Sequence, residues 1–202
     1  MRRAASGNRA RVLGVLALSL LTVTLHAQTR QGQASDIPVA LRFVATEANA
    51  PPGSCGCFWL KGGAIDAALP LHRRLLAEVE LAASTVDRVP ATTRGLSEIT
   101  LLAGPRYTVP LHHATASAHA LFGAVRGFDA DFVLRANRAD TSTNFAMAFG
   151  GALELPLSRS FSLRVAEVDF IQTNLPNGAN NRQRNIRMGA GIVFHVTLPT
   201  GR

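Results

Sequence analysis

The end of the chain, residues 185–196, alternates between apolar residues and polar or small ones. The apolar set occupies the even positions, as Ile186, Met188, Ala190, Ile192, Phe194 and Val196. The odd positions hold Asn185, Arg187, Gly189, Gly191 and His195, with Val193 as the apolar exception. A period of two predicts a β-strand with one apolar face and one polar face. Such a strand fits a barrel wall that has lipid outside and a polar interior.

Seven further stretches with strand character precede this one at nearly even spacing. The eight strand candidates cover residues 37–48, 58–69, 74–86, 95–109, 115–128, 143–155, 160–173 and 184–196. Short connections at 70–73, 110–114 and 156–159 alternate with longer ones at 49–57, 87–94, 129–142 and 174–183. This layout predicts an all-β fold, an eight-stranded antiparallel up-and-down transmembrane barrel with its short turns in the periplasm. The barrel domain would span 37–196, and residues 197–202 would form a C-terminal tail.

The first 27 residues have the pattern of a secretory signal peptide. A basic segment with four arginines precedes an apolar run at 12–25, and Leu25-His26-Ala27 offers a cleavage site. The apolar run is shorter than the roughly 20 residues that a membrane-spanning helix needs. An uncleaved anchor is the alternative, because leucine is not ideal three residues before a cleavage site. Residues 28–36 are polar and are expected to form a short linker.

The charge composition argues for a lipid environment more than for nucleic acid. The formal net charge is +8, but lysine and arginine are scattered along the chain without a basic run after the leader. A nucleic-acid site would gather them on one patch. Attraction to the anionic head groups of membrane lipids is a simpler account of the charge. Outer-membrane lipids are therefore an expected partner, and nucleic acid is not.

Charged residues fall on the inward phase of several strand candidates. In 74–86, for example, Glu78 and Glu80 alternate with Leu75, Val79 and Leu81. A buried charge is tolerated when it is paired, and an eight-stranded barrel is only wide enough for its side chains to fill it. We therefore expect a plugged interior. The predicted interior charge network comprises Arg42, Glu78, Glu80, Glu98, Arg106, Glu154, Arg164 and Arg187.

The seventh strand candidate breaks the alternation. Leu163 and Val165 set an outward phase opposite Arg164, yet Glu167 and Asp169 then fall in that same outward phase. A β-bulge near Ala166 would return both carboxylates to the interior.

Four segments of the sequence resemble a known family of outer-membrane proteins. They are residues 49–58 (NAPPGSCGCF), 104–108 (GPRYT), 150–153 (GGAL) and 187–194 (RMGAGIVF). The chain is similar in these segments to outer-membrane β-barrel proteins of the OmpA-like and opacity-porin type, in an acidobacterial version. The resemblance implies an exported eight-stranded barrel, folded into the outer membrane by the assembly machinery, with no catalytic residues to carry over.

Cys55-Gly56-Cys57 is the most distinctive local motif. A local disulfide is the default in an oxidising compartment, although the short spacing would strain the ring. Free or intermolecular thiols are a second possibility. A metal site is a third, but two thiolates are an incomplete set for zinc, which takes four ligands.

The histidines and serines do not predict an enzyme. His112 and His113 fall in a short turn, where solvated histidines are expected, while His119 and His195 could point inward and bond a carboxylate. Hydrolysis of lipid esters would require a serine with a histidine base held by a carboxylate, and no His-x-Ser pattern occurs on a strand candidate. The sequence therefore predicts no catalytic, cofactor-binding or metal-ligating residue.

The expected function is that of a small integral outer-membrane protein. Its long loops would face outside and serve a structural or surface-contact role, or at most limited passive solute passage, with an unknown extracellular partner. The alternatives are a soluble secreted β-barrel that binds a small apolar ligand and, third, an outer-membrane lipid-modifying barrel enzyme.

Overall fold

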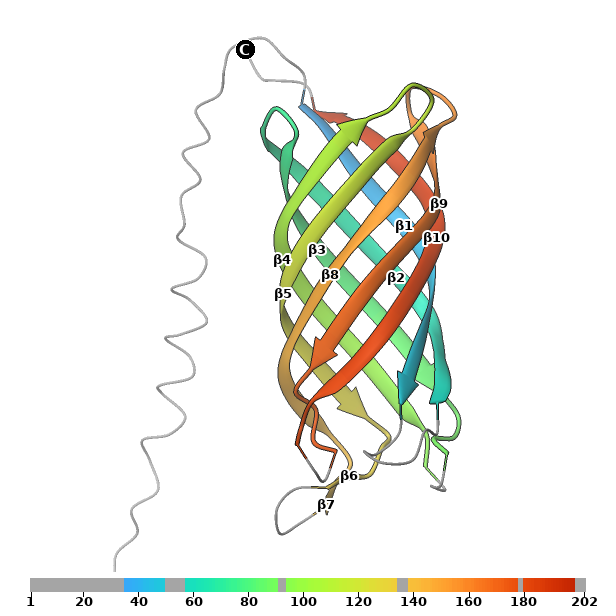
Figure 1. The fold of residues 1–202 in the computed structure, drawn as a ribbon, viewed down its shortest axis with the longest axis vertical. Helices are drawn as coiled ribbons and strands as arrows, with labels where there is room; N and C mark the ends of the chain where they lie inside the picture. Colours follow the sequence, from blue (N-terminus) through green and yellow to red (C-terminus); the bar gives the residue numbers. More distant parts are fainter. Residues whose placement is uncertain (1–34, 50–56, 91–93, 134–137, 178–179, 199–202) are drawn as a thin grey trace, which may run out of the picture. The chain divides into compact units, whose positions relative to one another are not determined.

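Eight long strands close into one barrel in the computed structural model (Figure 1). The structure describes residues 35–49, 57–90, 94–133, 138–177 and 180–198. The barrel strands are β1 (Ser35–Asn49), β2 (Cys57–His72), β3 (Leu75–Val86), β4 (Leu96–Pro110), β5 (Thr115–Phe128), β8 (Ser142–Pro156), β9 (Phe161–Thr173) and β10 (Gln183–Leu198). Their order around the barrel is β1-β10-β9-β8-β5-β4-β3-β2. This confirms the predicted eight-stranded up-and-down topology.

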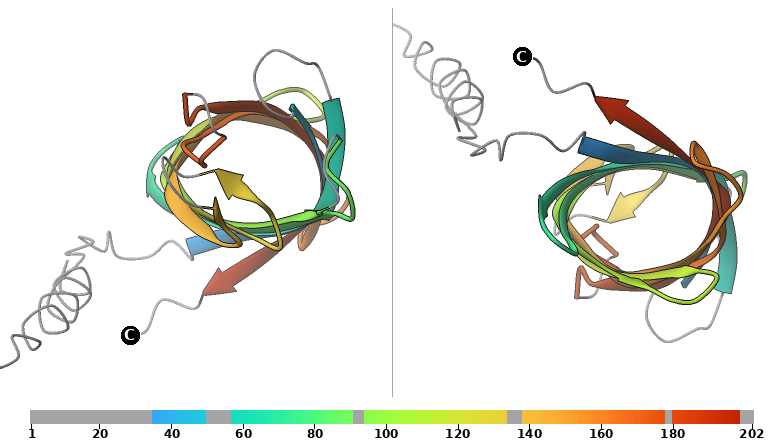
Figure 2. Two further views of the ribbon diagram at one scale, coloured as in Figure 1. Left: turned by 90° about the horizontal axis from the view of Figure 1, so that it is seen from below. Right: turned by 90° about the horizontal axis from the view of Figure 1, so that it is seen from above.

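The barrel closes where the first strand meets the last. β1 and β10 pair antiparallel from Ser35 opposite Leu198 to Glu47 opposite Ile186. The closed ring is visible along the barrel axis in Figure 2. A ring without edges leaves no unpaired row of backbone groups, as hydrocarbon surroundings require. β1 begins two residues before the predicted strand and β10 ends two residues after it, so both reach into the predicted linker and tail.

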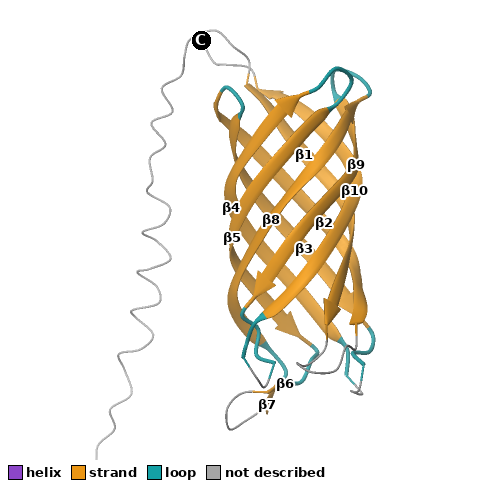
Figure 3. Cartoon of the chain, viewed as in Figure 1, coloured by secondary structure: helices purple, strands orange, loops and turns teal. Residues whose placement is uncertain are grey.

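The outer wall of the barrel is apolar. The exposed side chains include Leu41 and Phe43 on β1, each 60% exposed, and Leu101 on β4, 56% exposed. The predicted phases of β3 and β10 are confirmed, because the apolar set of each points outward. Glu78 and Glu80 on β3 and Asn185 and Arg187 on β10 are buried. Such an outside is unfavourable in water and suited to lipid. The regular secondary structure of the described residues consists of strands (Figure 3). Among these residues, no helix is long and apolar enough to span a membrane.

A β-bulge in β9 restores the inward phase, as predicted. The register with both neighbouring strands shifts between Arg164 and Glu167. Val165 and Ala166 are both exposed, while Glu167 and Asp169 are buried. The extra residue therefore turns the two carboxylates from the lipid side to the interior.

The long-loop end of the barrel is filled by apolar side chains. The connection between β5 and β8, predicted as plain loop, contains a small antiparallel pair of strands, β6 (Phe132–Val133) and β7 (Arg138–Ala139). Phe132 is buried in a cluster with Phe58, Leu96 and Leu175. Gly127 makes room for it, because a Cβ there would overlap the Phe132 ring. The loop thus contributes a side chain to the barrel core.

A charged side chain placed on the outer wall should destabilise the barrel by an amount that depends on its depth in the membrane. We expect Leu101→Arg, near the middle of β4, to cost about 2–4 kcal/mol of unfolding free energy, because the guanidinium would face hydrocarbon. The matched control is Leu157→Arg. Leu157 lies in the short turn between β8 and β9, and its side chain is 67% exposed, so its replacement should cost about 0–1 kcal/mol. Urea unfolding in lipid vesicles measures both, and equal costs would contradict a lipid-facing wall.

Candidate functional site

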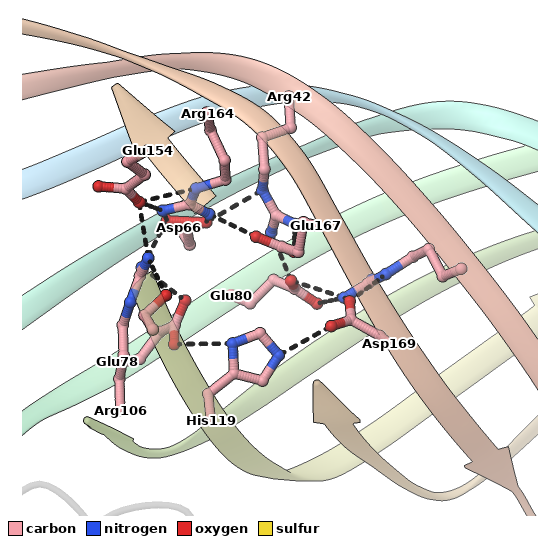
Figure 4. Close-up of polar contacts among 12 residues, drawn as sticks. Arg42, Asp66, Glu78, Glu80, Arg106, His119, Glu154, Arg164, Glu167 and Asp169 are labelled. Carbon is pink, nitrogen blue, oxygen red and sulfur yellow. Dashed lines mark hydrogen bonds and ion pairs between the residues drawn. The ribbon is translucent and has the colours of Figure 1, made fainter. Parts of the chain in front are cut away.

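Ionisable side chains from all eight barrel strands meet inside the barrel (Figure 4). Each belongs to the inward phase of its strand, and each is at most 8% exposed. We call this set the interior network. It comprises Arg42 (β1), Asp66 (β2), Glu78 and Glu80 (β3), Arg106 (β4), His119 (β5), Glu154 (β8), Arg164, Glu167 and Asp169 (β9) and Arg187 (β10).

Arg164 is the most completely surrounded cation of the network. Its guanidinium lies 2.7 Å from Asp66, 2.7 Å from Glu167 and 2.8 Å from Glu154. Arg42 lies 3.0 Å from the same Asp66 oxygen, Oδ1, and also contacts Glu167. Asp66 and Glu167 are therefore each shared by two arginines. Charge-assisted hydrogen bonds of this kind are the strong ones in a low-dielectric interior.

The other arginines connect strands that are not neighbours in the sheet. Arg187 on β10 lies 2.7 Å from Glu80 on β3 and 2.7 Å from Asp169 on β9. On β8, Gly150 faces Asp169 and makes room for its carboxylate, because a Cβ there would overlap Oδ1. Arg106 on β4 binds Glu154 of β8 at 2.7 Å. The network thus crosses the interior from wall to wall.

His119 joins two carboxylates of the network. Its Nε2 lies 2.9 Å from Asp169 and its Nδ1 lies 3.4 Å from Glu78. Four arginines face six carboxylates in the network, so 4 − 6 gives a charge of −2 with His119 neutral. A proton on His119 would lower this excess by one.

Three carboxylates of the network come close enough together to suggest a metal site. Oxygen atoms of Glu80, Glu167 and Asp169 lie within 4.8 Å of one another. Arg42 contacts Glu80 and Glu167, while Arg187 contacts Glu80 and Asp169. The guanidinium groups therefore already supply the positive charge that buried carboxylates require.

The structure brings together seven of the eight residues predicted for the network. Glu98 is the exception, because it is buried in the interior but forms no ion pair with another described residue. Sequence reasoning left Asp66, Glu167, Asp169 and His119 out of the set. The β-bulge predicted near Ala166 places Glu167 and Asp169 inside, and the sequence also predicts that His119 could bond a carboxylate. Asp66 was missed because both phases of β2 are mostly apolar.

The remaining sequence candidates lie away from the network. His72, His112 and His113 are exposed at the short-turn end, where solvated histidines were expected. Cys55 lies outside the described residues, and Cys57 is described only as the first residue of β2. The loop disulfide stays a prediction.

A second polar group lies at the short-turn end of the interior, and sequence reasoning missed it. Ser162 on β9 lies 2.8 Å from His195 Nε2, and His195 Nδ1 lies 2.9 Å from Asp36 on β1. A serine, a histidine and a carboxylate in this order form the hydrogen-bonded chain of serine hydrolases. Ser162 is only 5% exposed. The three residues are far apart in the sequence, so a local motif could not reveal them.

Removing Arg164 should destabilise the barrel strongly. We expect Arg164→Met to cost about 3–5 kcal/mol of unfolding free energy, because three buried carboxylates each lose a partner. Arg159→Met is the control, since Arg159 is exposed in a short turn and should change stability little. Urea titration of both variants in detergent micelles measures the difference. An Arg164→Met barrel as stable as the control would show that the network does not hold the interior together.

Comparisons with known proteins found solved structures with a similar fold, but no protein similar in sequence. Neither a protein-family model nor a curated protein sequence matches the chain. Neisserial surface protein A matches with a TM-score of 0.63 and 16% identity over 82% of this chain and 100% of that one. The crystal structure of Ail, the attachment invasion locus protein of Yersinia pestis, in complex with the heparin analogue sucrose octasulfate matches with a TM-score of 0.56 and 11% identity. The match covers 81% of this chain and 100% of that one. The chain therefore has the closed eight-stranded barrel fold of small outer-membrane proteins, as its resemblance to OmpA-like barrels predicts.

Proposed function

We propose that the chain is an integral outer-membrane protein with a structural or surface-contact role, carried out by its long loops. The observation that carries the proposal is the interior network, which links strands across the barrel with ion pairs. A barrel built in this way offers a rigid support for loops and little room for transport. The apolar outer wall holds the support in lipid.

The interior is filled at more than one level. The apolar cluster around Phe58 and Phe132 lies at the long-loop end, and the network lies below it. A cavity of about 20 Å³ lies in the interior, which is room for about one water molecule. A soluble carrier of an apolar ligand would need a larger apolar cavity and a polar exterior. Passive solute passage would require the network to rearrange.

The surface partner we propose is polyanionic. Basic side chains are exposed at the long-loop end, including Arg88, Arg126, Arg182 and Arg184. Such groups bind lipid phosphates and sulfated or phosphorylated glycans by charge-assisted hydrogen bonds. The crystal complex of Ail with a heparin analogue supports this class of partner.

The proposal is tested by fractionation followed by conductance. We expect the protein in the outer-membrane fraction, with gel mobility that changes on heating because the folded barrel resists detergent. In planar bilayers we expect no conductance from the wild type or from Arg106→Ala, with an open porin as the positive control. Conductance in either form would favour limited solute passage instead. A soluble periplasmic protein without a heat shift would favour the ligand-binding barrel.

The Ser162–His195–Asp36 chain supports a second candidate function, ester hydrolysis at the short-turn end. Ser162 Oγ would attack the ester carbonyl while His195 takes its proton and returns it to the leaving alcohol, and water would then release the acyl group. The burial of Ser162 ranks this candidate second, because a substrate must reach its oxygen.

A serine-reactive probe separates the two candidates. Under the surface-contact proposal, a fluorophosphonate leaves the detergent-solubilised protein unlabelled, because Ser162 is shielded. Hydrolysis would instead give labelling that Ser162→Ala abolishes. Ser158→Ala is the matched control, since Ser158 is an exposed serine of the adjacent turn, and its loss should leave labelling of Ser162 unchanged.

A further inference from the structure

The cavity in the barrel interior lies on the long-loop side of the network. Its wall includes Glu98 and Thr100 from β4, Thr173 from the end of β9, and Asn185 from the start of β10. β4 and β9 lie on different sides of the barrel, separated by β5 and β8. The cavity is therefore formed by the tertiary structure and not by one hairpin. Its volume of about 20 Å³ accepts one occupant of the size of water.

Four of the oxygen atoms that line this cavity lack hydrogen-bond partners. Glu98 Oε1, Thr100 Oγ1, Thr173 Oγ1 and Asn185 Oδ1 form no hydrogen bond with any described residue. Their residues are 7%, 7%, 1% and 2% exposed, respectively. A buried polar group without a hydrogen-bond partner destabilises the folded state, so four in one cavity point to a shared ligand.

These four oxygen atoms are of the kind that coordinate a hard cation. Carboxylate, amide carbonyl and hydroxyl oxygens are the ligands that such cations take in proteins. Glu98 also has no ion-pair partner among the described residues, and coordination to a cation is one of the ways in which a buried carboxylate is stabilised. Oxygen ligands beside a carboxylate without an ion-pair partner are the features that a cation site requires.

We propose that this cavity binds one monovalent cation, sodium or potassium, through Glu98, Thr100, Thr173 and Asn185. The charge of the ion follows from the neighbouring residues. Arg187 lines the same cavity, although Glu80 and Asp169 pair with its guanidinium. One positive charge balances Glu98, which is the one carboxylate among the residues that line the cavity. The cation would join β4 to β9 and β10 across the interior.

Cation-dependent stability tests the proposal. The full chain is refolded in detergent micelles in sodium, potassium or N-methylglucamine chloride at equal ionic strength, and unfolded with urea. N-methylglucamine is too large for the cavity. We expect sodium or potassium to raise the unfolding midpoint of the wild type. At a concentration roughly ten times the Kd, the unfolding equilibrium should shift about tenfold. Glu98→Gln, of the same shape without the charge, should lose this dependence.

Two further measurements separate a bound ion from a general salt effect. Glu47→Gln is the matched control, because Glu47 is an exposed glutamate on β1 at the same end of the barrel, and it should keep the cation dependence. Crystals soaked in rubidium chloride should show an anomalous peak between Glu98 and Asn185 in the wild type and none in Glu98→Gln. Equal midpoints in all three salts, or a Glu98→Gln barrel that keeps the dependence, would overturn the proposal. A wild-type cavity without a rubidium peak would also overturn it.

Discussion

Backbone hydrogen bonding in lipid is the constraint on which the rest of this structure depends. Hydrocarbon offers no partner to a free N–H or C=O, so a chain of strands must close on itself. The pairing of β1 with β10 provides that closure. A closed wall with a period of two then separates its side chains into an outer and an inner set. The inner set must fill a narrow tube without water, and the interior network follows from that need.

The interior is layered along the barrel axis. An apolar cluster and the small cavity around Glu98 lie side by side toward the long-loop end, the network follows, and Ser162 with His195 lies at the short-turn end. A different interaction stabilises the buried side chains of each layer. Apolar groups pack, charges pair with opposite charges, and hydroxyl and imidazole groups bond one another. At the cavity, Glu98, Thr100, Thr173 and Asn185 each have an oxygen without a hydrogen-bond partner among the described residues.

The sequence predicts the wall better than the interior. Alternation in β3 and β10 identifies both faces, and the bulge in β9 follows because Glu167 and Asp169 could not face lipid. The partner of an inward charge depends on the stagger of strands around the barrel, which no local pattern records. Glu98 shows this limit, since its phase was predicted but its isolation from the network was not. The β6–β7 pair was missed because two residues on each side are too few to alternate.

The dispersal of the network over all eight strands has a consequence for how the barrel assembles. Any partial barrel that lacks one strand leaves at least one charged or polar group of the network without its partners. Its carboxylates and guanidinium groups would then face lipid or a water-filled gap, at a high cost in free energy. We therefore expect intermediates with some strands inserted to be poorly populated. Folding and membrane insertion are then expected to form one cooperative event, in which the pairing of β1 with β10 closes the ring.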